Sequence, residues 1–401
     1  MDSAKTDGFQ KDYLSYNKKL HDYSPAVKKI LNLVASYIPD AEKAHANGRQ
    51  AVWCHTYNWE PLFLYSLDAI PAGYTEMGRY STMDEMLIAE DYYQFPAETC
   101  SMVKCTVGQW HLRQGGGIKK ILGGSSNCEP YNLSWEIMRR EGYDVFNYDV
   151  LYRAPSVTGI RLQELANFFA EQLYDVAEWL TGKREIDEEK LRGEILRSNR
   201  LIKKVKKILD LRVQHPFYIR SLPTILMLNV GVSNYFGKPD EFEDAVDLLL
   251  AELENQPVNE SELKRVIPLV WGGGTGQEFG LYEAIDQSNG ALLGFRSIPK
   301  LYDETLPPIQ SLINYVYNSQ RAGASVYARD FIEAEVERLK AKGIIFYGYL
   351  GCSFASVDRE LWRKYFHEKG IPSISLEGSF QVGNPSGQVL TRIKAFVEML
   401  A

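Results

Sequence analysis

The sequence predicts an α/β protein with two Rossmann-like (flavodoxin-like) parallel-sheet domains, an N-terminal helical arm and a helical middle segment. Three observations lead to this prediction. Short apolar runs alternate with helical patterns over residues 46–157, the same alternation returns over residues 263–401, and long helical periodicities fill residues 158–262. Alternation of short strands with helices is typical of a parallel sheet that helices cover on its faces.

The first elements follow from local patterns. The N-terminal arm, residues 1–45, has apolar side chains at helical spacing in AVKKILNLVASYI and no strand-like alternation. In the first α/β domain, residues 46–157, strands are indicated by AVWC, KKILGG and DVFNYDV. The stretch NLSWEIMRREG has the spacing of a helix, and Gly142 is a typical helix stop.

The remaining chain divides in the same way. The middle segment, residues 158–262, holds the long periodic stretches LQELANFFAEQLYDVAEWL, EEKLRGEILRSNRLIKKVKKIL and DEFEDAVDLLLAEL. The second α/β domain, residues 263–401, returns to the β-rich runs RVIPLVW, GALLGF, GIIFYGYL and PSISLEG, each followed by a helical pattern. The last of these helices is SGQVLTRIKAFVEML.

Composition excludes some partners. The chain has 45 Lys and Arg against 52 Asp and Glu, a formal net charge of -7, and no long basic run. We therefore expect no nucleic-acid partner. The polar stretch MDSAKTDGFQKDYLSYNKKL lacks the apolar region of a signal peptide, and no stretch approaches the roughly 18 apolar residues of a membrane span. We expect a cytoplasmic protein with no membrane partner.

The chain has five cysteines, an odd number that argues against a disulfide framework in a reducing compartment. Cys54 ends a predicted strand, Cys128 and Cys352 stand in turns between a strand and a helix, and Cys100 precedes a helix. A free cysteine is usually a small buried hydrophobe, but such a residue is expected within a strand or on the apolar face of a helix. Ligands collect at the carboxyl ends of parallel strands, so the joint placement predicts a shared site.

Cys105 is interpreted differently from the other cysteines. It follows Cys100 by five residues, which is about 140° around a helix. Both side chains cannot point at one site if this segment is helical. We predict that Cys105 fills the core.

The ligand type narrows the choice of metal. Thiolates select zinc, copper(I) or an iron–sulfur cluster. The sequence lacks the paired C-x₂-C motif of structural zinc sites and the compact cysteine run of ferredoxins. Cysteines so far apart require a site that the fold assembles from distant loops, and such a site can leave one iron open to substrate.

Three stretches carry a resemblance to a known family. FPAETCSMVKCTVG, SSNCEPYNLSWEIMRREGYDVFNYDV and GIIFYGYLGCSFASVDRELWRKYFHEKGIPSISLEGS resemble the 2-hydroxyacyl-CoA dehydratase and benzoyl-CoA reductase family, with similarity from about residue 46 to the C-terminus. The resemblance implies a [4Fe-4S] cluster held by Cys100, Cys128 and Cys352. Cys54 matches a position that is Ser or Cys in this family, so it is either a fourth ligand or a group on the substrate side.

The resemblance also implies an activity and partners. The chain would be the iron–sulfur subunit of an ATP-activator-dependent radical enzyme, a lyase that dehydrates 2-hydroxyacyl-CoA. Its partners would be the acyl-CoA substrate, a homologous subunit in a homodimer or heterodimer, and a separate ATP-dependent activator that reduces the cluster. Two alternatives stay open: a benzoyl-CoA-reductase-type subunit, and a non-catalytic electron-transfer subunit in which four cysteines close the cluster.

Two motifs depart from the family pattern. The chain reads WCHTYNWEP where the first motif commonly continues to Pro-Glu-Glu or Pro-Gln-Glu, and YLGC where the late motif commonly has Asn-Arg-Ser-Cys. The missing Arg removes a cation from beside the cluster. We therefore place the chain in a divergent branch of the family.

Three residues near the cysteine turns are candidate acid–base groups. His55 adjoins Cys54, and an unperturbed imidazole pKa of about 6.5 suits proton transfer, although a hydrogen-bonded loop histidine is equally compatible with the sequence. Glu60 and Glu129 lie near the cysteine turns, although a solvated carboxylate is the commoner case.

The glycine-rich stretch WGGGTGQEFG follows a predicted strand. It fits neither of the two common nucleotide-binding patterns, so it is either a tight turn or a contact for CoA or substrate. Because the sequence contains no ATP motif, we assign any coupled nucleotide hydrolysis to a partner protein.

Overall fold

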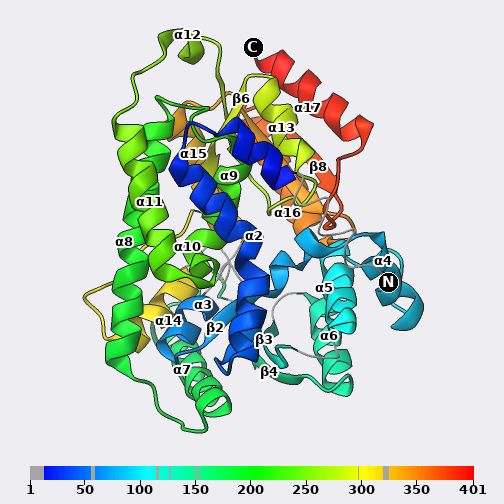
Figure 1. The fold of residues 1–401 in the computed structure, drawn as a ribbon, viewed down its shortest axis with the longest axis vertical. Coiled ribbons are helices and arrows are strands. Elements are labelled where there is room, and N and C mark those ends of the chain that lie inside the picture. The colour runs from blue at the N-terminus through cyan, green and yellow to red at the C-terminus, as the bar shows by residue number, and fades with distance from the viewer. Residues whose placement is uncertain are drawn as a thin grey trace.

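The computed structural model describes residues 13–55, 59–113, 117–125, 128–149, 151, 153–296, 298–318 and 325–401. Two parallel sheets stand one above the other in the view of Figure 1, and helices surround both. The predicted α/β class with two Rossmann-like sheets is confirmed. No helix within the described ranges is both long enough and apolar enough to cross a membrane.

The first sheet has four parallel strands in the order β2-β1-β3-β4. Their bounds are β1 (Ala51–Cys54), β2 (Ile70–Gly73), β3 (Lys120–Ser125) and β4 (Asp144–Asp149). In the central strand β1, Trp53 pairs with Ala72 on one side and with Ile121 on the other. The direction in which strands are added reverses between β1 and β3, and such a reversal opens a crevice at the carboxyl ends of the two strands.

Helices cover this sheet and carry the loops at its carboxyl edge. They are α3 (Glu60–Ser66), the 3₁₀ helix η1 (Tyr74–Tyr80), α4 (Met83–Leu87), the π-turn η2 (Ile88–Tyr92), α5 (Ser101–Leu112) and α6 (Glu129–Arg140). Helix α6 ends just before Gly142, which has a φ of 83° and so stops the helix as predicted. Gly123 on β3 makes room for this helix, since a Cβ there would lie 2.7 Å from Cε2 of Trp135.

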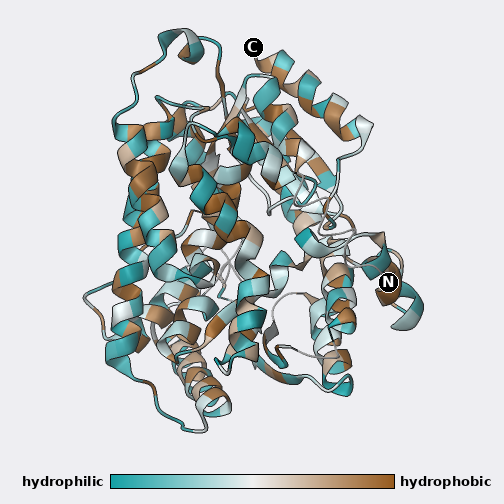
Figure 2. Cartoon of the chain, viewed as in Figure 1, coloured by the Kyte–Doolittle hydropathy of each residue, from teal (hydrophilic) through white to brown (hydrophobic). Residues whose placement is uncertain are grey.

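A helical stretch without an intervening strand follows in residues 159–263, all of which the structure describes. Its elements are α7 (Gly159–Thr181), α8 (Glu188–Arg212), α9 (Ser221–Leu226), η3 (Met227–Gly231), α10 (Val232–Asn234), η4 (Tyr235–Gly237), α11 (Pro239–Glu254) and α12 (Glu260–Leu263). The Asp187 carboxylate caps α8 by accepting from the N–H groups of Glu189 and Lys190. Figure 2 shows hydrophobic and hydrophilic residues mixed along α8 and α11, as expected for helices that bury one face.

The second sheet repeats the strand pattern of the first in the order β6-β5-β7-β8. Its strands are β5 (Ile267–Trp271), β6 (Gly290–Phe295), β7 (Gly343–Tyr349) and β8 (Ser373–Gly378). Every residue of β6 and β7 is buried, because helices cover both faces. These helices include α13 (Gly280–Gln287), α15 (Ser325–Leu339), α16 (Ser353–Glu368) and α17 (Gly387–Leu400).

The N-terminal arm is divided into two helices. Residues 13–20 form the first helix and α2 (Pro25–Ala46) the second. The hydroxyl of Ser24 caps α2 by accepting from the N–H of Val27 at 3.1 Å, which starts a new helix in a different direction. Residues 1–12 of the predicted arm lie outside the described residues.

Helix α14 (Pro308–Asn318) joins the two sheet units. It belongs to the second α/β stretch of the sequence, yet Leu312 and Val316 pack in the same apolar cluster as Val52 and Leu122 of the first sheet. Another apolar cluster contains Trp53 of the first sheet together with Trp271 of the second. The two units therefore share buried surface, which fixes how the loops at their carboxyl edges meet.

Candidate functional site

Four cysteines lie at the carboxyl edges of the two sheets. Cys54 is the last residue of β1, at the crevice of the first sheet. Cys100, Cys128 and Cys352 immediately precede α5, α6 and α16 respectively. The sequence patterns put these residues at strand ends and helix starts, and the structure places them there.

Cys100 and Cys352 are brought into contact from the two different sheet units. The thiol of Cys100 hydrogen-bonds to the sulfur of Cys352, which lowers the pKa of Cys352 to about 6. The same hydrogen bond, together with burial, raises the pKa of Cys100 far above the usual range. Two thiols in such contact can hold one proton between them, so their titration belongs to the pair.

Cys128 lies close enough to this pair for the charge of Cys352 to change its pKa. Burial is the main cause that raises its pKa to about 11, and the charge of Cys352 adds to the rise. Burial is also the main cause that raises the pKa of Tyr131, on the first turn of α6, and the charges of Cys128, Cys100 and Cys105 add to this rise. Cys100 is buried, Cys128 and Cys352 are partly buried, and the three thiols lie within electrostatic reach of one another.

Backbone and side-chain groups favour thiolate at this place. The N–H groups of Met102 and Val103 lower the pKa of Cys100, and that of Ala355 lowers the pKa of Cys352. These N–H groups belong to helix N-termini, where no intrahelical acceptor exists. The charge of Arg359 also lowers the pKa of Cys352. Although YLGC lacks the family's Arg, α16 supplies a cation about two turns after Cys352, which the sequence analysis missed.

Cys54 lies apart from this group. It is fully buried, and its pKa is raised well above the usual value by burial and then by the charge of Glu60. Tyr74, the first residue after β2, senses the charges of both Cys54 and Cys128. Tyr74 therefore lies within electrostatic reach of both Cys54 and Cys128.

The three predicted acid–base residues have different surroundings. His55 is half-buried, and its ring stands perpendicular to that of Tyr74 with centroids 5.7 Å apart. Glu60 is fully buried and accepts a hydrogen bond from the hydroxyl of Tyr148 on β4. Glu129 is exposed on the first turn of α6 and is adjacent to Cys128, whose pKa its charge raises. Glu60 is thus an interior group, not the solvated carboxylate that is common at the surface.

Cys105 is fully buried on α5. Burial raises its pKa far above the ordinary value, a hydrogen bond with Ser81 opposes this rise, and the charge of Glu85 adds to it. Ser81 precedes α4 and Glu85 lies within it, so this cysteine packs toward that helix. The thiol-to-thiol hydrogen bond at this site joins Cys100 to Cys352 instead.

An aromatic layer around the cysteines was missed by sequence reasoning. The ring of Tyr74 meets those of Trp110 and Trp135 edge-on, at centroid distances of 5.8 and 5.6 Å. The rings of Tyr131 and Trp135 stack at 5.3 Å. All four rings are buried, so the layer excludes water from one side of the thiol group. Because strand β2 was not predicted, the sequence analysis had no signal for Tyr74 at its end.

The glycine-rich loop after β5 packs tightly against β7. A Cβ at Gly273 would lie 2.4 Å from the carbonyl oxygen of Tyr347, and one at Gly272 would lie 2.5 Å from the ring of Phe346. Side chains larger than hydrogen have no room at these two positions. This packing favours the tight-turn interpretation of the loop at its first glycines.

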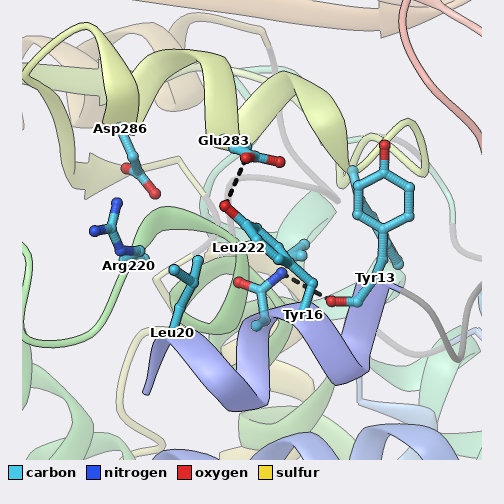
Figure 3. Close-up of a pocket in the computed structure, with 9 residues that line it drawn as sticks. Tyr13, Tyr16, Leu20, Arg220, Leu222, Glu283 and Asp286 are labelled. Atoms are coloured by element: carbon cyan, nitrogen blue, oxygen red, sulfur yellow. Dashed lines mark hydrogen bonds between the residues drawn. The ribbon is translucent and has the colours of Figure 1, made fainter. Parts of the chain in front are cut away.

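A shallow pocket lies elsewhere, between the first N-terminal helix and α13 (Figure 3). Tyr16 crosses it and donates a hydrogen bond to Glu283 at 2.8 Å. Asp286 on its floor accepts from the N–H of Ser221 at 3.1 Å. The contact of Tyr16 docks the N-terminal arm on the second unit, and that of Ser221 joins α9 to α13.

Among the residues that the structure describes, no three or more His, Cys, Asp or Glu side chains form a group that could hold a metal ion. Comparison with known families gives one finding: the family described as 2-hydroxyglutaryl-CoA dehydratase, D-component, matches residues 61–400 of the chain. No curated protein matches the chain.

Proposed function

The chain belongs to the 2-hydroxyglutaryl-CoA dehydratase D-component family, and on this premise we propose that it is the iron–sulfur subunit of an ATP-activator-dependent enzyme that dehydrates a 2-hydroxyacyl-CoA. A dehydratase-type component follows from the family itself. The cluster, the thioester substrate and the activator are the proposal.

One observation carries the proposal most directly. Cys100 and Cys352, which are 252 positions apart in the chain, share a hydrogen bond between their sulfurs, and Cys128 senses the same charge. Three thiols from distant loops have no structural need to meet. Their meeting at the carboxyl edges of two sheets suits a shared soft-metal group.

The donor chemistry fits an iron–sulfur cluster. The three side chains offer only sulfur, and backbone N–H groups at helix N-termini stand beside two of the sulfurs, where they favour thiolate. The ligands of a cluster bind different irons, so they need not surround one point as the ligands of a single ion do. Cys100, Cys128 and Cys352 are the residues that would hold it.

When bound, a [4Fe-4S] cluster would supply one electron at low potential to the substrate thioester. The chain's own residues would then have three roles: they exclude water, supply positive charge and transfer protons. The aromatic layer of Tyr74, Tyr131, Trp110 and Trp135 excludes water from one side of the site. Arg359 contributes positive charge near Cys352.

Proton transfer is assigned to His55 and Glu60. The imidazole of His55 lies against Tyr74 at the half-buried side of the site. The carboxylate of Glu60 accepts a hydrogen bond from the hydroxyl of Tyr148, and its charge acts on Cys54. Removal of a substrate hydroxyl requires a proton donor, and we assign this role to these two side chains.

A second candidate function is a non-catalytic electron-transfer subunit. It is favoured by the complete burial of Cys54 at the crevice of the first sheet, where a fourth thiol could close the cluster. The electrostatic partners of Cys54 are Glu60 and nearby tyrosines, which favours the substrate-side role.

The proposed activity is tested in an anaerobic assay. The chain, its co-purifying subunit and an ATP-dependent activator would be incubated with a series of 2-hydroxyacyl-CoA thioesters, and the products analysed by mass. Loss of one water that depends on ATP supports the proposal. Two-electron ring reduction of benzoyl-CoA without dehydration would assign the reductase class instead.

A further inference from the structure

Ser101 lies at the boundary between the two sheet units, next to the candidate ligand Cys100. Ser101 is the first residue of α5, follows Cys100 directly and is 1% exposed. Its N–H donates to the carbonyl of Leu350 at 2.9 Å, and its hydroxyl accepts from the N–H of Phe380 at 3.1 Å. Both partners belong to the second unit, one on each side of Cys352 in the chain.

The backbone of the turn before Cys352 allows the two units to approach closely. Gly351 has a φ of 77°, a conformation that side chains rarely adopt. A Cβ at this position would lie 2.3 Å from the carbonyl oxygen of Glu98. The backbone of residues 98–101 therefore lies directly against that of residues 350–352, with no side chain between them.

A second backbone contact between the two units lies just after β8. The N–H of Val382 donates to the carbonyl of Gly78 at 3.0 Å. A Cβ at Gly78 would lie 2.0 Å from the carbonyl oxygen of Phe380. Phe380 is thus held between η1 and Ser101, and the hydroxyl of Ser101 sets how closely it approaches α5.

From this geometry we infer that Ser101 is a positioning residue that holds Cys100 against Cys352 across the boundary of the two units before any cluster is present. Its two hydrogen bonds fix the α5 N-terminus relative to the Cys352 turn. The first N–H of a helix has no intrahelical partner, so a carbonyl from the other unit satisfies it. The site is therefore pre-assembled by protein contacts, and this inference goes beyond the proposed function, since it concerns the metal-free chain.

The test uses the metal-free, reduced chain with only two thiols, in a Cys54→Ser, Cys105→Ser, Cys128→Ser background. Dibromobimane, which becomes strongly fluorescent when both of its arms react with thiols, reports how often Cys100 and Cys352 are close. Ser101→Ala should slow cross-linking about tenfold, because a buried N–H loses its acceptor. Ser101→Thr, which keeps the hydroxyl, should restore much of the rate.

Ser66→Ala is the matched control. Ser66 is equally buried, but its hydroxyl donates to Phe63 within its own helix at 2.7 Å and does not bridge the units. Its cross-linking rate should equal that of the parent. Hydrogen exchange gives a second readout, because the amide of Phe380 should exchange faster in Ser101→Ala and not in Ser66→Ala.

A Ser101→Ala chain that melts cooperatively, cross-links at the parent rate and keeps its Phe380 amide protected would overturn the inference. Neither measurement needs iron. A chain that binds no cluster but shows the Ser101 effect refutes the proposed cofactor alone. A chain that binds a cluster but shows no Ser101 effect refutes the positioning role alone.

Discussion

The thiol of Cys100 hydrogen-bonds to the sulfur of Cys352, and the two residues come from different sheet units. This contact places two candidate ligands where loops from the two sheet units meet. Loss of either residue should therefore affect the metal site and the fit of the two units together.

Single cysteine substitutions separate ligands from core residues. We predict that Cys100→Ser, Cys128→Ser and Cys352→Ser each lose or strongly destabilise the cluster, because serine keeps the size but removes the soft ligand. Cys105→Ser should retain iron, because that thiol packs toward α4. Iron content after anaerobic reconstitution measures both outcomes, and a Cys105→Ser chain unable to hold iron would contradict the assignment.

Cys54 distinguishes the catalytic role from the electron-transfer role. If it lies on the substrate side, Cys54→Ser should keep iron near the parent content and alter acyl-CoA binding or turnover. We expect this result, since the charge of Glu60 is the interaction that acts on its thiol. A changed EPR signal or loss of iron in this variant would instead make Cys54 a fourth ligand.

Asp286 should make the fold less stable at high pH. Burial raises its pKa to about 6 from an ordinary 3.8, although the charges of Arg220 and Arg212 oppose this rise. The folded state thus binds the proton more tightly, so the stabilising contribution is complete below about pH 4 and is lost as pH rises through about 6. Asp286→Asn, which keeps an acceptor for Ser221, should raise the free energy of unfolding at pH 8 by at most about 3 kcal/mol.

Urea unfolding at a series of pH values measures this effect. The difference in stability between Asp286→Asn and the parent should grow from pH 4 to pH 7 and then level off. A difference that is constant over this range would show that Asp286 titrates normally in the folded chain.

Two glycine substitutions should have opposite effects on stability. Gly123→Ala places a Cβ 2.7 Å from the ring of Trp135 and should destabilise the fold by about 1–3 kcal/mol. Gly193→Ala adds a methyl group on the exposed face of α8 with no atom within 4 Å and should stabilise it by about 0.5–1 kcal/mol. Thermal or urea unfolding checks the pair, and equal effects would contradict the packing of α6 on β3.

The sequence predicted the strands that have clear apolar runs. The run AVWC became β1 and GIIFYGYL became β7, because buried parallel strands need continuous apolar residues. Strand β2 was not predicted, since Ile70–Gly73 is only four residues long and contains Pro71. Its formation depends on pairing with β1, which is a tertiary effect.

The candidate site was predictable only where local sequence patterns mark its residues. Cys128 and Cys352 stand next to local signals, a strand end and a helix start, that a sequence displays. The burial of Glu60 against Tyr148 joins residues 88 positions apart, and the packing of α14 on the first sheet joins residues still further apart. No local pattern encodes such contacts, and so they were missed.

The central claim is tested most directly by analysing the metal in the anaerobically purified chain. Iron, acid-labile sulfide and zinc would be quantified per chain, and EPR spectra recorded after reduction. We predict brown protein with about four irons and matching sulfide per chain, as expected for one [4Fe-4S] cluster. Stoichiometric zinc, or no metal after anaerobic reconstitution with iron and sulfide, would contradict it.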